Sequence, residues 1–111
     1  MVSFNTNTLK HVDVIEVTGR LDSSNVDQFD EVLKELTENK RYKLVLDLSA
    51  VTYMSSAPMR AMVSALRTCK KHSGDVYIAN PSERVQEVLG LAGFDSVFNV
   101  YKDQLTAVGD F

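Results

Sequence analysis

The sequence predicts an α/β fold in which helices pack on a mixed, mostly parallel β-sheet. The run at 44–48 is almost wholly apolar, which is typical of a strand that is covered on both faces. Amphipathic segments of about ten to fifteen residues alternate with such strands, which indicates right-handed β-α-β crossovers. Two strands open the chain and would add an antiparallel edge. The predicted order is therefore β-β-α-β-α-β-α-β-α.

The first part of the chain supplies the opening strands and a helix. Residues 2–8 are predicted to form a short strand, and 12–18, which is rich in β-branched residues, a second one that Gly19 ends. Ser23 or Ser24 is expected to cap the helix that follows. The apolar stripe of this helix consists of Val26, Phe29, Leu33 and Leu36.

The centre of the chain predicts a strand, a turn and a helix in direct succession. The strand at 43–48 leads to the turn 54–58, which reads Met-Ser-Ser-Ala-Pro and begins a helix with Pro58. Such a turn places small hydroxyl groups beside free backbone N–H groups at the positive end of a helix dipole. An anion, or a phosphate made on one of the serines, can be held there. The apolar stripe of this helix is Met59, Met62, Val63, Leu66 and Cys69.

The last third predicts two more strands and two more helices. Residues 72–74 stop the second helix, and 76–79 form a short buried strand. Asn80 at the cap, Pro81 at the first helical position and Glu83 make a start that resembles a capping box. The remaining expectations are an end to this helix at Gly90 and Gly93, a strand at 97–101 and a terminal helix at 102–108.

Composition limits the classes of function. With 111 residues, 44% of them hydrophobic, the chain suits one compact domain over 1–111 without disulfides or a structural metal. A net charge of −3 with scattered lysines and arginines argues against nucleic-acid binding. The start of the chain lacks a long apolar run, and Cys69 is the single cysteine. We therefore expect a cytoplasmic protein without a membrane partner.

Catalysis is not expected. The two histidines are His11, before a strand, and His72, at a helix end, so neither is positioned beside a serine nucleophile. No G-x-S-x-G elbow, P-loop or zinc-binding Cys/His spacing occurs in the sequence. Asp47 ends an apolar strand, and a structural hydrogen-bonding role is favoured for it. The sequence predicts no cofactor, no metal and no catalytic residue.

Three motifs together resemble one known family. Residues 19–22 match a G-x-L-D loop, 46–49 match a D-L-S strand end, and 54–60 match the turn that follows it. With this element order, the chain resembles a STAS domain of the anti-sigma factor antagonist type over nearly its whole length. In that family the turn typically reads D-S-S/A-G-L-G, and its serine is phosphorylated by an anti-sigma factor that is also a kinase.

The resemblance implies a function and a set of residues. The protein would bind an anti-sigma factor of the serine-kinase type and so free a sigma factor. Phosphorylation of Ser56, with Ser55 as the back-up acceptor, would switch it off, and a serine phosphatase would be a further partner. The expected partner contacts are Asp22, Ser23, Ser55, Ser56, Ala57, Met59 and Arg60.

The turn departs from the family pattern at three positions, which leaves alternatives open. Ser55 stands in place of the aspartate, Pro58 in place of a glycine and Arg60 in place of the second glycine. Pro58 lacks an N–H that could hold a phosphate, whereas Arg60 lies one turn from Ser56 and could pair with it. The alternatives are a constitutive STAS interaction module, or an anion- or nucleotide-binding STAS domain, that is not phosphorylated.

Individual residues also have simpler interpretations. The hydroxyl of Ser56 could cap the helix, which is worth about 1 kcal/mol. Asp22 could serve as the polar lead-in to a helix cap. The basic side of the second helix is expected to be a solvated face, with a secondary contact surface as the alternative. Its cations are Arg60, Arg67, Lys70 and Lys71.

Overall fold

The computed structural model confirms the predicted order of elements. It describes residues 2–111, without the side chain of Asp95. One short 3-10 helix, η1, is added between the last two helices. The elements are β1 (Ser3–Thr8), β2 (Asp13–Leu21), α1 (Val26–Glu38), β3 (Lys43–Met54), α2 (Ala57–Lys71), β4 (Asp75–Ala79), α3 (Glu83–Ala92), η1 (Phe94–Ser96), β5 (Asn99–Tyr101) and α4 (Gln104–Gly109).

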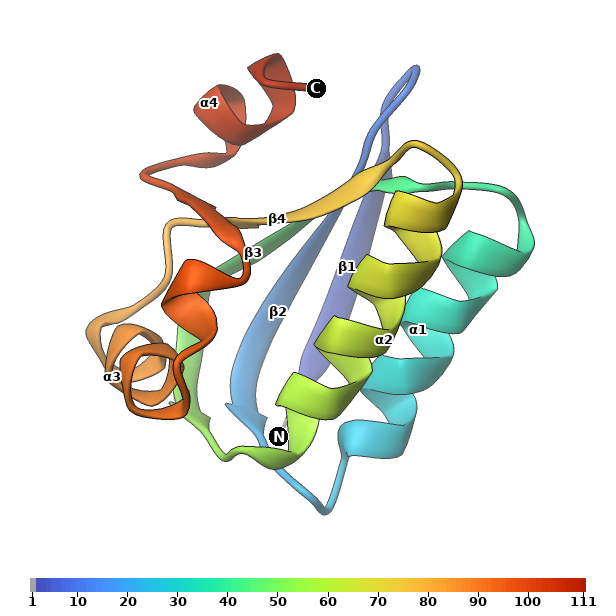
Figure 1. Cartoon of the computed structure of the whole chain (residues 1–111). Helices are drawn as coiled ribbons and strands as arrows, with labels where there is room; N and C mark the ends of the chain where they lie inside the picture. Colours follow the sequence, from blue (N-terminus) through green and yellow to red (C-terminus); the bar gives the residue numbers. More distant parts are fainter. Residues whose placement is uncertain (1) are drawn as a thin grey trace.

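The five strands form one sheet in the order β1-β2-β3-β4-β5. As expected, β1 pairs antiparallel with β2, and the other pairs are parallel. Helices α1 and α2 lie side by side against one face, and α4 lies apart from them at the other end of the molecule (Figure 1). The α/β fold class with a mixed, mostly parallel sheet is therefore confirmed.

The apolar run in β3 explains why the sheet is covered on both faces. Leu44, Leu46 and Leu48 are buried in the main core together with Phe29 of α1 and Met62 of α2. Residues between them point to the other face, where a smaller cluster forms beneath α4. That cluster contains Val12, Val14, Val45, Tyr77, Ala79 and Ala107.

Two strands run further than the sequence predicted. Gly19 does not end β2, because its φ of 98° accommodates a register shift and pairing resumes through Leu21. β3 likewise continues past Leu48 to Met54 and stays paired with β2. The extra length carries the ends of both strands to the start of α2.

The cap predicted for α1 is wrong. The helix begins after Asn25 rather than after Ser23 or Ser24, and Asn25 makes no side-chain capping bond. Its side chain instead accepts a hydrogen bond from the N–H of Asp22 at 3.0 Å and donates one to the carbonyl of Arg20 at 2.8 Å. Asn25 therefore closes the loop that precedes the helix.

The boundaries of α3 also differ from the prediction. The cap is Ser82, not Asn80, and its hydroxyl donates to the carbonyl of Val51 at 2.8 Å while accepting the N–H of Val85 at 3.4 Å. Gly90 lies within the helix, and Gly93 alone ends it with a φ of 75°. A tertiary bond to β3 thus selects the cap.

Cys69 is buried on the inner face of α2. Burial, assisted by the negative charge of Asp75, raises the pKa of the Cys69 thiol to about 11. At pH 8 only about one thiol in a thousand would then be ionised. We expect iodoacetamide to leave Cys69 unmodified in the folded protein while it alkylates the urea-unfolded chain fully, as measured by intact mass. Equal rates in both states would contradict this burial.

No helix within residues 2–111 combines the length and the apolar character that crossing a membrane requires.

Candidate functional site

The candidate site is the corner where β3 passes into α2. β3 ends at Met54 and α2 begins at Ala57, so only Ser55 and Ser56 lie between them. The N–H of Ser55 donates to the carbonyl of Leu21, the last residue of β2, at 3.0 Å. This bond fixes the corner against the loop that leads into α1.

The two serines have different environments. Ser55 is half-buried, and its Oγ accepts a hydrogen bond from the N–H of Ala57 at 3.3 Å. Ser56 is exposed and occupies the N-cap position with helical angles (φ −75°, ψ −15°), and its hydroxyl makes no capping bond. The expectation that Ser56 caps the helix through its side chain is therefore wrong. Ser55 satisfies the orphan N–H, and the Ser56 hydroxyl stays available to another molecule.

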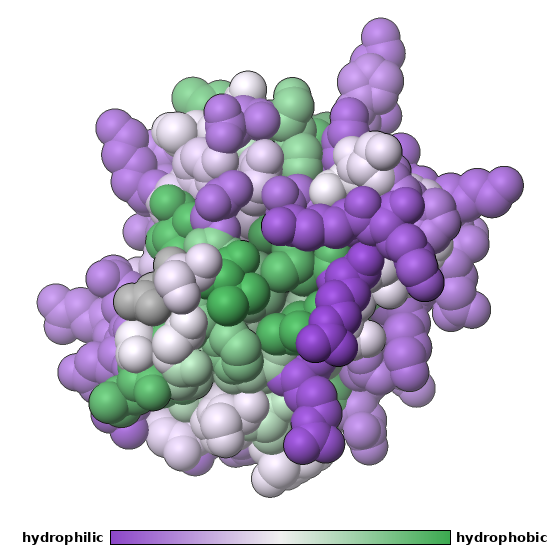
Figure 2. Space-filling model, in the orientation of Figure 1, coloured by the Kyte–Doolittle hydropathy of each residue, from purple (hydrophilic) through white to green (hydrophobic). Residues whose placement is uncertain are grey.

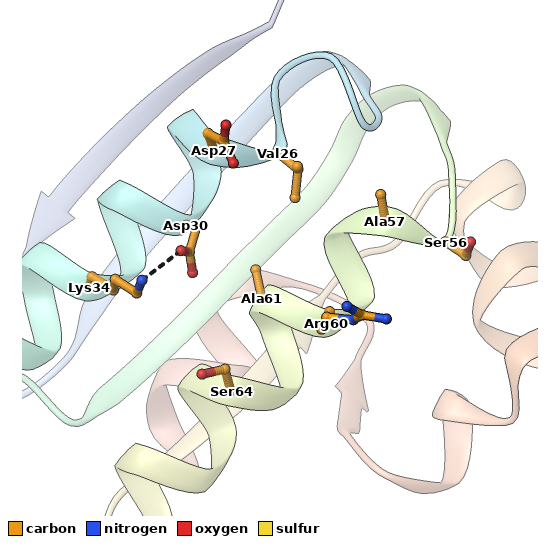
Figure 3. Close-up of a pocket in the computed structure, with 9 residues that line it drawn as sticks. All are labelled: Val26, Asp27, Asp30, Lys34, Ser56, Ala57, Arg60, Ala61 and Ser64. Atoms are coloured by element: carbon orange, nitrogen blue, oxygen red, sulfur yellow. Dashed lines mark ion pairs between the residues drawn. The ribbon is translucent and has the colours of Figure 1, made fainter.

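Ser56 begins a row of exposed side chains along α2. Arg60 and Ser64 follow at four-residue steps, while Ala57 and Ala61 face α1 (Figure 3). A hollow of about 540 Å³ lies between the two helices on that side. Its wall on α1 carries two carboxylates and Lys34, and its wall on α2 carries small side chains together with Arg60. It is lined by Val26, Asp27, Asp30, Lys34, Ser56, Ala57, Arg60, Ala61 and Ser64.

The loop before α1 is ordered by Asp22. Its Oδ1 accepts hydrogen bonds from the N–H of Ser24 at 3.0 Å and from the Ser24 hydroxyl at 2.5 Å. These bonds, with a smaller contribution from the nearby Arg20 guanidinium, lower the pKa of the Asp22 carboxyl. The carboxylate thus forms an Asx-type turn. This geometry favours the lead-in role for Asp22.

The predicted contact residues differ in accessibility. Ser23, Ser56 and Arg60 are exposed, whereas three others are half-buried around the same corner. Met59 is only 2% exposed and belongs to the main core, because it lies on the inner face of α2. Met59 therefore supports the surface from beneath and is not accessible as a partner contact. The half-buried residues are Asp22, Ser55 and Ala57.

Asp47 has the structural role that the sequence favoured. It is 9% exposed, and its Oδ1 accepts the N–H and the hydroxyl of Ser49 at 2.9 and 2.7 Å. Gln104 of α4 donates to Oδ2 of Asp47 and, at 2.7 Å, to Glu16 on the neighbouring strand. Sequence reasoning missed Gln104, because no local pattern relates residues this far apart. In the part of the chain that the structure describes, no cluster of three or more His, Cys, Asp or Glu residues could hold a metal.

Comparison with known proteins identifies the family. The family model for the STAS domain matches residues 3–107. The anti-sigma-B factor antagonist of Staphylococcus epidermidis is 27% identical over 101 residues, which cover 89% of this chain and 94% of that protein.

Solved structures share the fold. An anti-sigma factor antagonist from Mycobacterium paratuberculosis superposes with a TM-score of 0.90 at 19% identity, covering 99% of this chain and 93% of that one. The Bacillus cell fate determinant SpoIIAA, in its phosphorylated form, superposes with a TM-score of 0.77 at 16% identity, covering 97% and 98%. Because the family model spans almost all of residues 2–111, the chain belongs to the STAS domain family, alongside relatives named anti-sigma factor antagonists.

Proposed function

We propose that this protein is an anti-sigma factor antagonist that acts by binding and not by catalysis. Its corner surface binds an anti-sigma factor of the serine-kinase type and so frees a sigma factor, and phosphorylation of Ser56 switches the binding off. The proposal includes a cytoplasmic location and a serine phosphatase that resets Ser56. The observation that carries it is the exposed Ser56 hydroxyl, free of any capping bond, at the start of a 15-residue helix.

The site suits a reversible change of charge. A phosphate would add about −1.5 to −2 charge in the middle of the contact surface. The folded protein would tolerate it, because an anion at a helix N-terminus is favoured by about 0.3 to 1 kcal/mol. Arg60 lies one turn away, and it takes part in none of the ion pairs found among residues 2–111. The modification should therefore weaken binding without unfolding the domain.

The geometry favours Ser56 over Ser55 as the acceptor. A kinase needs the hydroxyl to reach its active site, and the Ser55 hydroxyl is half-buried and bonded to the N–H of Ala57. Phosphorylation is also compatible with this fold, since SpoIIAA has been solved in a phosphorylated form.

Intact mass tests the acceptor directly. The anti-sigma factor is first identified as the protein that co-purifies with the untagged chain from its own cell, and the pair is incubated with ATP. We expect a gain of about 80 Da for one phosphoryl group in the wild type and in Ser55→Ala, and no gain in Ser56→Ala. A gain that persists in Ser56→Ala would refute Ser56 as the acceptor.

A second candidate is a constitutive interaction module. It is favoured by Pro58, which has no N–H to offer a phosphate, and by Ser55, which stands where the family has an aspartate. In that case the wild type would bind the co-purified partner, and its mass would stay unchanged after incubation with ATP. Binding together with an unchanged mass would therefore select this function over the switch.

A further inference from the structure

A second hollow lies on the other side of the Ser56–Arg60 row. It has a volume of about 680 Å³ and runs along α2 opposite Phe94 of η1. We call it the α2–η1 groove. Figure 2, in the same orientation as Figure 1, shows apolar surface gathered in the middle of the face of the molecule that is turned to the viewer, beside hydrophilic side chains. Its lining includes Ser56, Met59, Arg60, Val63, Arg67 and Phe94.

The floor of the α2–η1 groove is apolar and partly open to solvent. Val63 and Phe94 are half-buried and pack on the edge of the main core, with Met59 beneath them. Leu91 and Val97, which flank η1 in sequence, are 91% and 44% exposed. Exposed apolar surface rimmed by polar groups is typical of a protein contact site. Val63 and Phe94 thus give the groove an apolar floor, while Leu91 and Val97 are exposed apolar residues near η1 in the sequence that are not part of the groove lining.

The rim along α2 is positively charged. Between Ala57 and Lys71 the helix carries four cations and no acidic residue. Arg60 and Arg67 are exposed, are separated by about 10.5 Å along the axis, and form no ion pair within the described chain. The hollow on the α1 side differs, because Asp30 there is paired with Lys34 at 3.0 Å. Arg60 lines both hollows, but of the two only the α2–η1 groove adds Arg67, so it combines an apolar floor with two guanidinium groups that form no ion pair among the described side chains.

We propose that the α2–η1 groove docks an acidic amphipathic helix of a protein partner. The apolar stripe of that helix packs on Val63 and Phe94, and its carboxylates pair with Arg60 and Arg67. Arg60 also lies four residues from Ser56, so a phosphate there neutralises one end of the rim and repels the incoming carboxylates. This last step rests on the proposed function, and it makes the groove the surface on which the switch acts.

A synthetic peptide tests the groove without knowledge of the partner. The probe is an 18-residue helical peptide with leucine at i, i+3 and i+7 spacing and glutamate on both flanks, and its control has lysine in place of glutamate. In a ¹⁵N NMR titration we expect the acidic peptide to shift the amides of 60–68 and of Phe94, and the basic peptide to shift none of them. Equal binding of both peptides, or shifts confined to the α1 side of α2, would overturn the proposal.

Charge reversal gives a matched control. The double variant Arg60→Glu/Arg67→Glu should bind the acidic peptide at least tenfold more weakly, whereas Lys10→Glu/Lys102→Glu changes the net charge equally outside the groove and should bind like the wild type. All four positions are exposed, so both variants should keep the fold, with amide shifts that differ from the wild type only near the substituted residues. Equal losses in the two variants would mean that net charge alone drives binding and would refute the groove.

Two further outcomes separate this proposal from its alternatives. If vesicles of phosphatidylserine and phosphatidylcholine shift the groove amides while the acidic peptide does not, α2 is a membrane-binding surface and the proposal fails. If the groove binds the acidic peptide but Ser56 is never phosphorylated, the groove stands and the switch fails. A phosphorylated Ser56 with no peptide binding overturns the groove alone.

Discussion

Replacing Ser56 by Asp is expected to lower the affinity for the anti-sigma factor about a hundredfold, while Ser56→Ala stays within a few-fold of the wild type. Ser56 is exposed at the corner that we propose as the contact surface, so a carboxylate there is desolvated when the partner docks. A buried charge without a partner costs about 3 to 5 kcal/mol, and Arg60, one turn away, should offset part of this, which leaves a cost of about 3 kcal/mol. Each step of about 1.4 kcal/mol is a tenfold loss of affinity. Isothermal titration of each variant against the co-purified partner measures the effect.

The control for this prediction is a carboxylate placed elsewhere. Asn7→Asp adds the same charge at an exposed position of edge strand β1, opposite Val14 near the start of β2 and so at the other end of the sheet from the corner, and should leave the affinity unchanged. The melting temperature of Ser56→Asp should match or slightly exceed that of the wild type, because the helix dipole favours an anion at its N-terminus. Equal affinities for Ser56→Asp and Ser56→Ala would refute the charge switch.

Gly74→Ala is expected to lower the free energy of unfolding by about 3 kcal/mol, a decrease of roughly 10 °C in the melting temperature. Gly74 links α2 to β4, and a Cβ built there would lie 1.9 Å from the carbonyl oxygen of Tyr42, just before β3. That oxygen accepts the N–H of Asp75 at 3.0 Å, and the N–H of Gly74 donates to Cys69 at 2.8 Å. A methyl group can be accommodated only if one of these backbone segments moves. Urea unfolding monitored by circular dichroism gives the change in free energy.

Alanine substitutions at two other glycines serve as controls for the loss of stability expected in Gly74→Ala. A Cβ at Gly109 meets nothing within 4 Å, so Gly109→Ala in α4 should be neutral or stabilising by up to about 1 kcal/mol. A Cβ at Gly93 is equally unobstructed, but its φ of 75° should make Gly93→Ala cost about 1 to 2 kcal/mol. A Gly74→Ala variant no less stable than Gly93→Ala would contradict the close approach of Tyr42.

Local patterns predicted the elements well because burial here is periodic. The residues at 44–48 and the apolar stripe of α2 are buried, and the spacing of apolar residues in the sequence predicts which of their side chains are buried. Caps were predicted poorly. Ser82, rather than Asn80, begins α3 because its hydroxyl also reaches the carbonyl of Val51, thirty-one residues away. Capping propensities depend on neighbouring residues in the sequence, so they cannot predict a contact over this separation.

The corner between β3 and α2 was predicted in position but not in detail. The motif located the corner, yet it could not say which serine hydroxyl bonds to the N–H of Ala57, because that depends on the backbone angles of the turn. The α2–η1 groove was also beyond the sequence, since η1 was not predicted and Phe94 meets α2 only through the tertiary fold. The basic side of α2 was recognised, but its apolar neighbour was not.

The backbone bond between Ser55 and Leu21 has a kinetic consequence. It joins the start of α2 to the end of β2, while Asn25 and Asp22 hold the intervening loop to the same framework. The partner would thus meet a preformed shape, and encounter need not wait for a loop to become ordered. We expect diffusion and charge steering to set the association rate. Modification of Ser56 should slow association, because its charge repels the incoming carboxylates, and should also shorten the lifetime of the complex, because that charge is desolvated in the docked state.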